Sequence, residues 1–129
     1  MKEKSLEWLE FARLDFQAAQ DLLKLDERYA GISAYHAQQT AEKSIKAYLL
    51  LKNKEIKRTH DLLFLIEQCV LLDEDFVKMR TCSEYLDPFA VKTRYPDDAR
   101  FELSLEEAQE LVACSKIILE FVTLKINGS

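Results

Sequence analysis

The chain has 129 residues, a net charge of −5, and only two glycines and two prolines. This length fits a single domain over residues 1–129, and a composition rich in Leu, Ala, Glu and Lys favours long helices over short strands. The acidic balance excludes a general DNA- or RNA-binding protein, because neutralising phosphates requires a basic surface.

The first predicted helix covers residues 5–26, with Ser5 as its N-cap. Its apolar face is formed by Leu6, Leu9, Ala12, Phe16, Ala19 and Leu23. The chain then breaks at residues 27–31, and so short a turn predicts that the second helix packs antiparallel to the first. The second helix runs to about Lys52.

Polar side chains follow one flank of the second helix. Tyr35, Gln39, Glu42 and Lys46 are spaced by four, three and four residues, so they stack within one narrow arc. The same helix already has an apolar core face, so the row indicates a groove, a partner surface or a polar seam. The structural alternative is ordinary decoration, since an exposed Glu–Lys pair at this spacing contributes only about 0.3–0.5 kcal/mol to a helix.

A basic loop over residues 52–59 leads to the third helix. Thr59 is the predicted N-cap of that helix, with His60 and Asp61 in its first turn. The fourth helix covers residues 74–86 and stops before Pro88, since the residue before a proline disfavours helical backbone.

The longest irregular segment covers residues 89–103 and contains Arg94, Tyr95 and Asp97. Long ordered loops in small domains tend to be functional. Ser104 and Glu107 then form a capping box that starts the last helix, and Asn127 with Gly128 ends it. The sequence therefore predicts an all-α fold, an antiparallel up-and-down helical bundle of about five helices.

Cys69, Cys82 and Cys114 are odd in number and far apart, which fits neither a disulfide framework nor a close-spaced zinc motif. We expect reduced thiols on helix faces. The first five residues lack the apolar core of a signal peptide, and no apolar run approaches the ~20 residues needed to cross a bilayer. We therefore expect an unexported, cytoplasmic protein without a membrane contact, a metal or a cofactor.

Three segments together resemble the HEPN family (higher eukaryotes and prokaryotes nucleotide-binding domain), of the short single-domain prokaryotic type. They are residues 35–47 (YHAQQTAEKSIKA), 59–62 (THDL) and 94–97 (RYPD). The resemblance covers almost the whole chain and implies a helical bundle that commonly forms a homodimer. It also implies a minimal nucleotidyltransferase partner, the two proteins resembling a toxin–antitoxin pair.

Some members of that family are ribonucleases, whose motif is an arginine, four to six residues and then a histidine. The only histidines of this chain are His36 and His60. Arg28 is separated from His36 by seven residues, and Arg58 from His60 by one. The catalytic pair therefore cannot be transferred to this sequence, and its absence argues against ribonuclease activity.

The candidate ligand-binding residues come from the polar row, the start of the third helix and the irregular segment. They are Gln39, Glu42, Lys46, His60, Arg94, Tyr95 and Asp97. Lys46, His60 and Arg94 would contact an anion, since a guanidinium grips phosphate with two parallel hydrogen bonds. Glu42 and Asp97 would orient these cations. Tyr95 would stack on a base or cap the core. Each of these roles has a structural alternative. His60 would simply flank the Thr59 cap, and Arg94 would pair with a carboxylate within the fold.

Three functions follow from these residues. The leading hypothesis is a nucleotide-binding or interaction module, a homodimer that binds nucleotide or RNA phosphate and works with the nucleotidyltransferase. The second is a divergent ribonuclease in which His60 is the acid or base and Arg94 stabilises transition-state charge. The third is a purely structural dimerisation module whose interface is the polar row.

Overall fold

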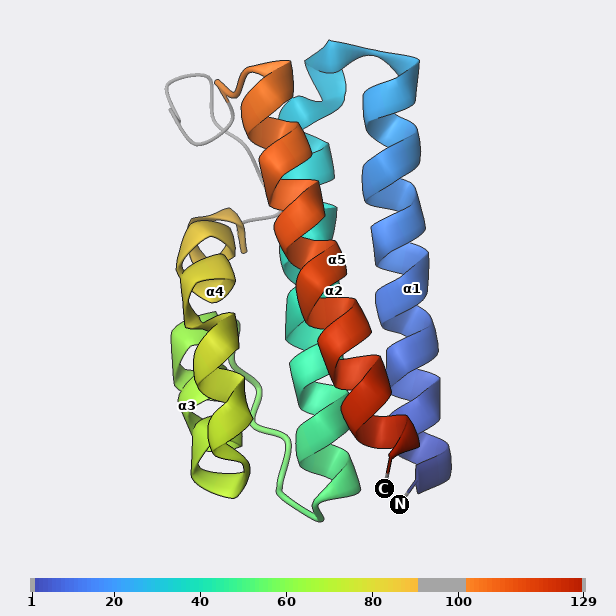
Figure 1. The fold of residues 1–129 in the computed structure, drawn as a ribbon. Helices are drawn as coiled ribbons and strands as arrows, with labels where there is room; N and C mark the ends of the chain where they lie inside the picture. Colours follow the sequence, from blue (N-terminus) through green and yellow to red (C-terminus); the bar gives the residue numbers. More distant parts are fainter. Residues whose placement is uncertain (1, 91–101, 129) are drawn as a thin grey trace.

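Three long helices form the body of the bundle, and two shorter helices lie along one side of it (Figure 1). The computed structural model describes residues 2–90 and 102–128. The helices are α1 (Lys2–Leu25), α2 (Ala30–Leu51), α3 (Leu62–Leu72), α4 (Arg80–Leu86) and α5 (Leu105–Asn127). Short 3-10 turns lie at Glu27–Tyr29, Glu74–Met79 and Asp87–Phe89, and these two stretches of chain contain no strand. The predicted all-α bundle of about five helices is confirmed.

The central helix is α2, which is buried on almost every side. Small residues such as Ala34, Ala37 and Ala41 are fully buried, so they let α1 and α5 approach closely. The Ser5 hydroxyl donates to the Ala47 carbonyl and the Ser33 hydroxyl to the Ala19 carbonyl, each at 2.7 Å. Because an early residue of α1 meets a late residue of α2, the two helices are antiparallel, as the short turn predicted.

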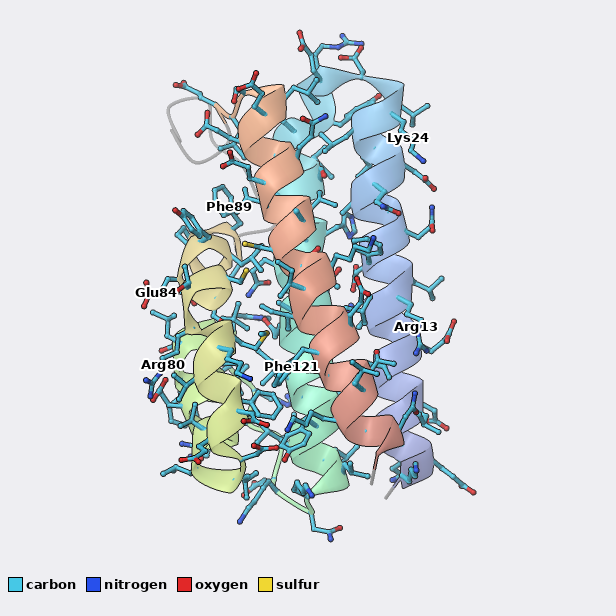
Figure 2. The ribbon with its side chains drawn as sticks, in the orientation of Figure 1. Arg13, Lys24, Arg80, Glu84, Phe89 and Phe121 are labelled. Atoms are coloured by element: carbon cyan, nitrogen blue, oxygen red, sulfur yellow. The ribbon has the colours of Figure 1, made fainter. Side chains whose placement is uncertain are left out.

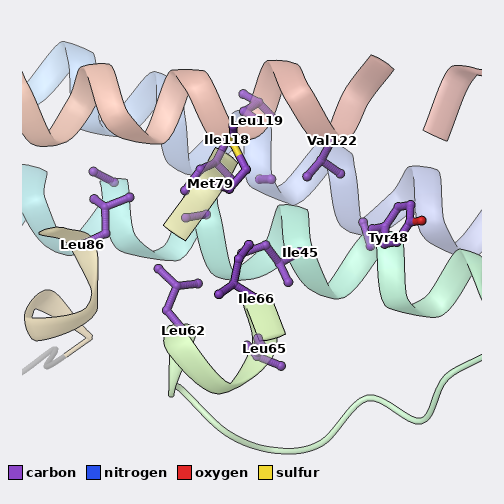
Figure 3. Packing of buried hydrophobic residues seen from close by; sticks show 14 of the residues in the cluster. Ile45, Tyr48, Leu62, Leu65, Ile66, Met79, Leu86, Ile118, Leu119 and Val122 are labelled. Atoms are coloured by element: carbon purple, nitrogen blue, oxygen red, sulfur yellow. The ribbon is translucent and has the colours of Figure 1, made fainter. Parts of the chain in front are cut away.

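The hydrophobic core continues between α2, α5 and the two shorter helices (Figure 3). Ile45 of α2 packs in the same cluster as Leu62 of α3 and Ile118 of α5. The Phe76 ring lies 4.5 Å from the Tyr48 ring and 5.0 Å from the Phe121 ring, centroid to centroid. Burying each large apolar side chain stabilises the fold by about 1.5–3 kcal/mol. This cluster therefore joins the shorter helices to the body of the bundle.

The outer surfaces are charged. Arg13 and Lys24 of α1 point away from the bundle, as do Arg80 and Glu84 of α4 (Figure 2). The Arg80 guanidinium donates two hydrogen bonds, of 2.6 and 2.7 Å, to the exposed Glu67 carboxylate. In the described part of the chain, no helix is long and apolar enough to cross a membrane.

Two predicted helix starts are wrong. Ser5 does not cap α1, because that helix already includes Lys2 and the Ser5 side chain is buried against α2. The predicted apolar face is otherwise confirmed, since Leu9, Ala12 and Ala19 are fully buried, and only Leu6 of that face is exposed, at 40%. Thr59 does not cap α3: the Asp61 carboxylate accepts from the Phe64 N–H at 3.0 Å, so His60 and Asp61 precede the helix.

The predicted fourth helix is divided. Residues 74–79 form a 3-10 turn that begins at Asp73, whose carboxylate accepts from the Asp75 N–H at 3.0 Å. The α-helical part, α4, starts only at Arg80, and Pro88 lies within the next 3-10 turn.

The last helix is confirmed at both ends. Its capping box has the Glu107 N–H donating to the Ser104 hydroxyl at 3.1 Å and the Ser104 N–H donating to the Glu107 carboxylate at 3.2 Å. Gly128 is its C-cap. The reciprocal capping box is therefore a more reliable start signal in this chain than a single Ser or Thr.

Candidate functional site

The carboxylate of Glu42 is the centre of a polar cluster on α2. Its Oε2 accepts a hydrogen bond from Lys46 Nζ at 3.0 Å, and its Oε1 lies 3.0 Å from His60 Nδ1. The side chains of Glu42 and Lys46 are 4% and 7% exposed, whereas that of His60 is 70% exposed. The Glu42–Lys46 pair is therefore a buried ion pair, and its interpretation as surface decoration is wrong.

The state of the His60 ring follows from its partner. An ionised carboxylate only accepts hydrogen bonds, so we assign the hydrogen to Nδ1. Nε2 is then the ring nitrogen that a ligand can reach. The exposed ring is thus held by a buried anion.

The linker after α2 brings His60 to this position. It turns near Asn53, whose φ of 58° lies in the left-handed region, and returns alongside α2 (Figure 1). The His60 carbonyl accepts from Gln38 Nε2 at 3.5 Å, and the Leu62 N–H donates to the Asp87 carboxylate at 2.9 Å. These contacts place His60 level with a part of α2 that is 18 to 22 residues earlier in the sequence.

Two glutamines complete the cluster. Gln38 and Gln39 each donate from Nε2 to Glu42 Oε1 at 3.4 Å, and Gln39 also donates to Gln38 Oε1 at 2.8 Å. Within residues 2–90 and 102–128, every buried side-chain nitrogen and oxygen has a hydrogen-bond partner. The predicted residue Gln39 therefore supports Glu42, while Gln38, which sequence reasoning missed, is fully buried beneath it.

A second cluster, again a carboxylate with one lysine and one histidine, lies between α1 and α2. Asp15 Oδ1 lies 2.9 Å from His36 Nδ1, and Asp15 Oδ2 accepts from Lys43 Nζ. Burial by itself raises the pKa of the Asp15 carboxyl, but the hydrogen bonds from His36 and Lys43 outweigh it and hold that pKa below its usual value. Sequence reasoning missed this cluster. Two features of the sequence could have indicated it. Asp15 lies beside the apolar face of α1, and His36 and Lys43 are seven residues apart, so they share one face of α2.

The two clusters share one geometry, in which a carboxylate joins the Nζ of a lysine to the Nδ1 of a histidine. His36 and His60 are the only histidines of the chain, and both are used in this way. Tyr35 lies near both carboxylates. The pKa of its hydroxyl is raised, mainly by burial and then by the negative charges of Asp15 and Glu42. Beside α2 there are thus two histidines, His36 on the helix and His60 on the linker, whose Nδ1 atoms are occupied and whose Nε2 atoms remain for a ligand.

Four of the predicted site residues are brought together, namely Gln39, Glu42, Lys46 and His60. Arg94, Tyr95 and Asp97 lie outside the residues that the structure describes. In the basic loop, Lys57 Nζ lies 5.2 Å from the centroid of the Phe64 ring, a cation–π contact. No group of three or more His, Cys, Asp or Glu side chains in the described ranges could hold a metal ion.

Comparison with known proteins finds one matching family and similar solved structures. The model of the HEPN domain matches residues 5–126. An archaeal HEPN homologue, ST0689, has a similar structure with a TM-score of 0.76 and 25% sequence identity, over 95% of this chain and 97% of that one. TT1696 from Thermus thermophilus also has a TM-score of 0.76, with 29% identity over 95% of this chain and 98% of that one. Among curated proteins, none matches.

Proposed function

Since the chain belongs to the HEPN domain family, we propose that it is a nucleotide-binding or interaction module whose α2 face contacts phosphate groups of a nucleotide or of RNA. The observation that carries this proposal is the exposed His60 ring, held through Nδ1 by the buried Glu42–Lys46 pair. A protonated imidazole held in this way donates its Nε2–H to a phosphate oxygen, a charge-assisted hydrogen bond.

The charges of the two clusters support an anion over a cation as the ligand. In each, one lysine balances one carboxylate, so protonation of the histidine leaves a net charge of +1. Lys43 and His36 are partly exposed, so the second cluster also offers its donors to solvent. We propose that both clusters contact the phosphates of one ligand, with Tyr35 between them.

The test measures the affinity of inorganic pyrophosphate, ATP and a single-stranded oligouridine for the wild type and for two single variants, His60→Ala and His36→Ala. Removing a charged hydrogen bond should weaken binding by about 1.5–3 kcal/mol, roughly 10- to 150-fold. The matched control is Arg13→Ala, which removes an exposed cation from the outer side of α1. If both histidine variants are folded and bind all three ligands as the wild type does, the site is wrong.

Two partners are part of the same proposal. From the family we propose a homodimer that works with a minimal nucleotidyltransferase in a toxin–antitoxin-like pair. The polar row gives little support to the alternative of a purely structural dimer built on it, because Glu42 and Lys46 are already buried within one chain. Light scattering measures the dimer, and co-purification with a co-expressed nucleotidyltransferase measures the pair. A protein that is monomeric at all concentrations would contradict the proposed homodimer.

A divergent ribonuclease is the second candidate function. The observation that favours it is the carboxylate–histidine arrangement of Glu42 and His60, which fixes the ring and leaves Nε2 to take or give a proton. Absence of RNA cleavage from pH 5 to pH 9 by a preparation that binds RNA would exclude it and leave the binding function intact.

A further inference from the structure

Two cysteines that are distant in the sequence meet between α4 and α5. The Sγ atoms of Cys82 and Cys114 lie 2.7 Å apart, although 32 positions separate the residues. The S–S bond of a disulfide is about 2.05 Å long, so the sulfurs need to approach by only about 0.7 Å. We propose that Cys82 and Cys114 form an oxidation site, in which an intramolecular disulfide joins α4 to α5.

An oxidant can reach this pair. Both cysteines are partly exposed. Cys114 also lines a pocket of about 540 Å³ whose walls include Tyr85, Leu111 and Ile117. The third cysteine, Cys69, is fully buried, and burial raises the pKa of its thiol far above the usual value. Because a buried, protonated thiol is unreactive, Cys69 is an internal control for the accessibility of the other two.

The chemistry balances with oxidised glutathione as the oxidant. One cysteine sulfur attacks the glutathione disulfide, forms a mixed disulfide and releases one glutathione thiol. The second cysteine then attacks the mixed disulfide, forms the Cys82–Cys114 bond and releases the second glutathione thiol. The protein loses two electrons and two protons, and the glutathione disulfide gains them.

The reaction should be slow. Burial, the hydrogen bond with Cys82 and neighbouring charge raise the pKa of Cys114 to about 12, so this thiol is protonated at neutral pH. Only the thiolate is a good nucleophile, and we expect closure over minutes to hours. The bond closes a ring of chain from residue 82 to residue 114, which restricts the unfolded state. It should raise the midpoint of thermal unfolding by about 5–15 °C.

The experiment incubates the full chain with oxidised glutathione and titrates free thiols after denaturation. The wild type should fall from three free thiols to one, and Cys69→Ser from two to none. The single variants Cys82→Ser and Cys114→Ser should form no intramolecular bond. A peptide map of the oxidised wild type should contain the Cys82 and Cys114 peptides joined, with the intact mass lower by about 2 Da.

The peptide map keeps the proposal testable even where a variant fails to fold, because it uses the wild type alone. Three free thiols after prolonged oxidation would overturn the proposal. A map that joins Cys69 to either partner, or a covalent dimer on a non-reducing gel in place of the internal bond, would overturn it as well.

Discussion

Glu42 illustrates how one residue changes meaning between sequence and structure. Spaced four residues before Lys46, it matches the exposed helix pair that contributes little to stability. In the fold, it is almost completely buried and accepts from Lys46, His60 and two glutamines. A buried ion pair of this kind costs desolvation when it forms, but removing one partner leaves an uncompensated charge. Glu42 is therefore a structural residue as well as a candidate site residue.

We expect Glu42→Ala to lower the free energy of unfolding by about 3–5 kcal/mol, because it leaves the Lys46 ammonium buried without its carboxylate. Urea denaturation followed by circular dichroism measures the loss. The matched control is Glu67→Ala, which breaks the exposed pair with Arg80 and should change stability very little. Equal losses in the two variants would contradict the buried environment of Glu42.

Asp15 predicts a pH dependence of stability. Its folded pKa lies below the usual carboxyl value of 3.8, despite burial, because His36 and Lys43 donate to it. A depressed folded pKa contributes stability that is present above the unfolded pKa and is lost as pH falls through the folded pKa. We expect Asp15→Asn to be less stable than the wild type at pH 7, with the difference shrinking as pH falls below about 4. Chemical denaturation across pH 2.5–7 checks this, and a difference independent of pH would contradict it.

At the scale of elements, the linker between α2 and α3 determines where His60 lies in the candidate site. The linker returns alongside α2 and ends at Asp61, which caps α3, so His60 is a linker residue that contacts Glu42. The predicted cap at Thr59 would have placed His60 in the first helical turn. Both residues are good N-caps by type, and only the observed hydrogen bond to Phe64 N–H distinguishes them.

The cap can be tested by two substitutions at adjacent hydrogen bonds. Asp61→Ala should cost about 0.5–2 kcal/mol of stability, because it removes the acceptor for the first turn of α3. Thr59→Ala removes only the acceptor for the Asp61 N–H, at an exposed position, and should cost clearly less. Thermal unfolding of both variants measures the two stability losses. A larger loss for Thr59→Ala than for Asp61→Ala would restore Thr59 as the cap.

At the scale of the molecule, the difference in burial between the helices leads us to expect a stable body and a weaker side. α2 packs between α1 and α5 and is buried almost throughout, whereas α4 is a short helix with only Ser83 and Leu86 buried. Large apolar side chains such as Leu71, Val77 and Tyr85 are exposed on the side formed by the shorter helices. Regions with fewer buried contacts open at a lower free energy than the core.

We therefore expect amide hydrogens of α4 to exchange faster than those of α2 in native-state hydrogen exchange. Mass spectrometry of the peptic fragments measures this. Oxidation of Cys82 and Cys114 should slow exchange in α4 without changing it in α2, since the bond ties only α4 to α5. Uniform exchange of all helices would contradict the division into a body and a weaker side.

The sequence by itself determined the features that depend on neighbouring residues. Helical composition, apolar periodicity and the Ser104 capping box are local properties, so the all-α fold and the last helix followed from them. The family likeness also followed, because it rests on short segments in a fixed order.

Only the tertiary structure decided which polar groups are buried and which distant residues meet. Sequence spacing grouped Gln39, Glu42 and Lys46, but burial, the contact with His60 and the separate cluster around Asp15 depend on how three elements pack. The approach of Cys82 to Cys114 has the same origin. Helical periodicity tells which side chains share a face of one helix. It carries no information about the element that covers this face, and that neighbour sets the burial and the charge partners on which the proposed site depends.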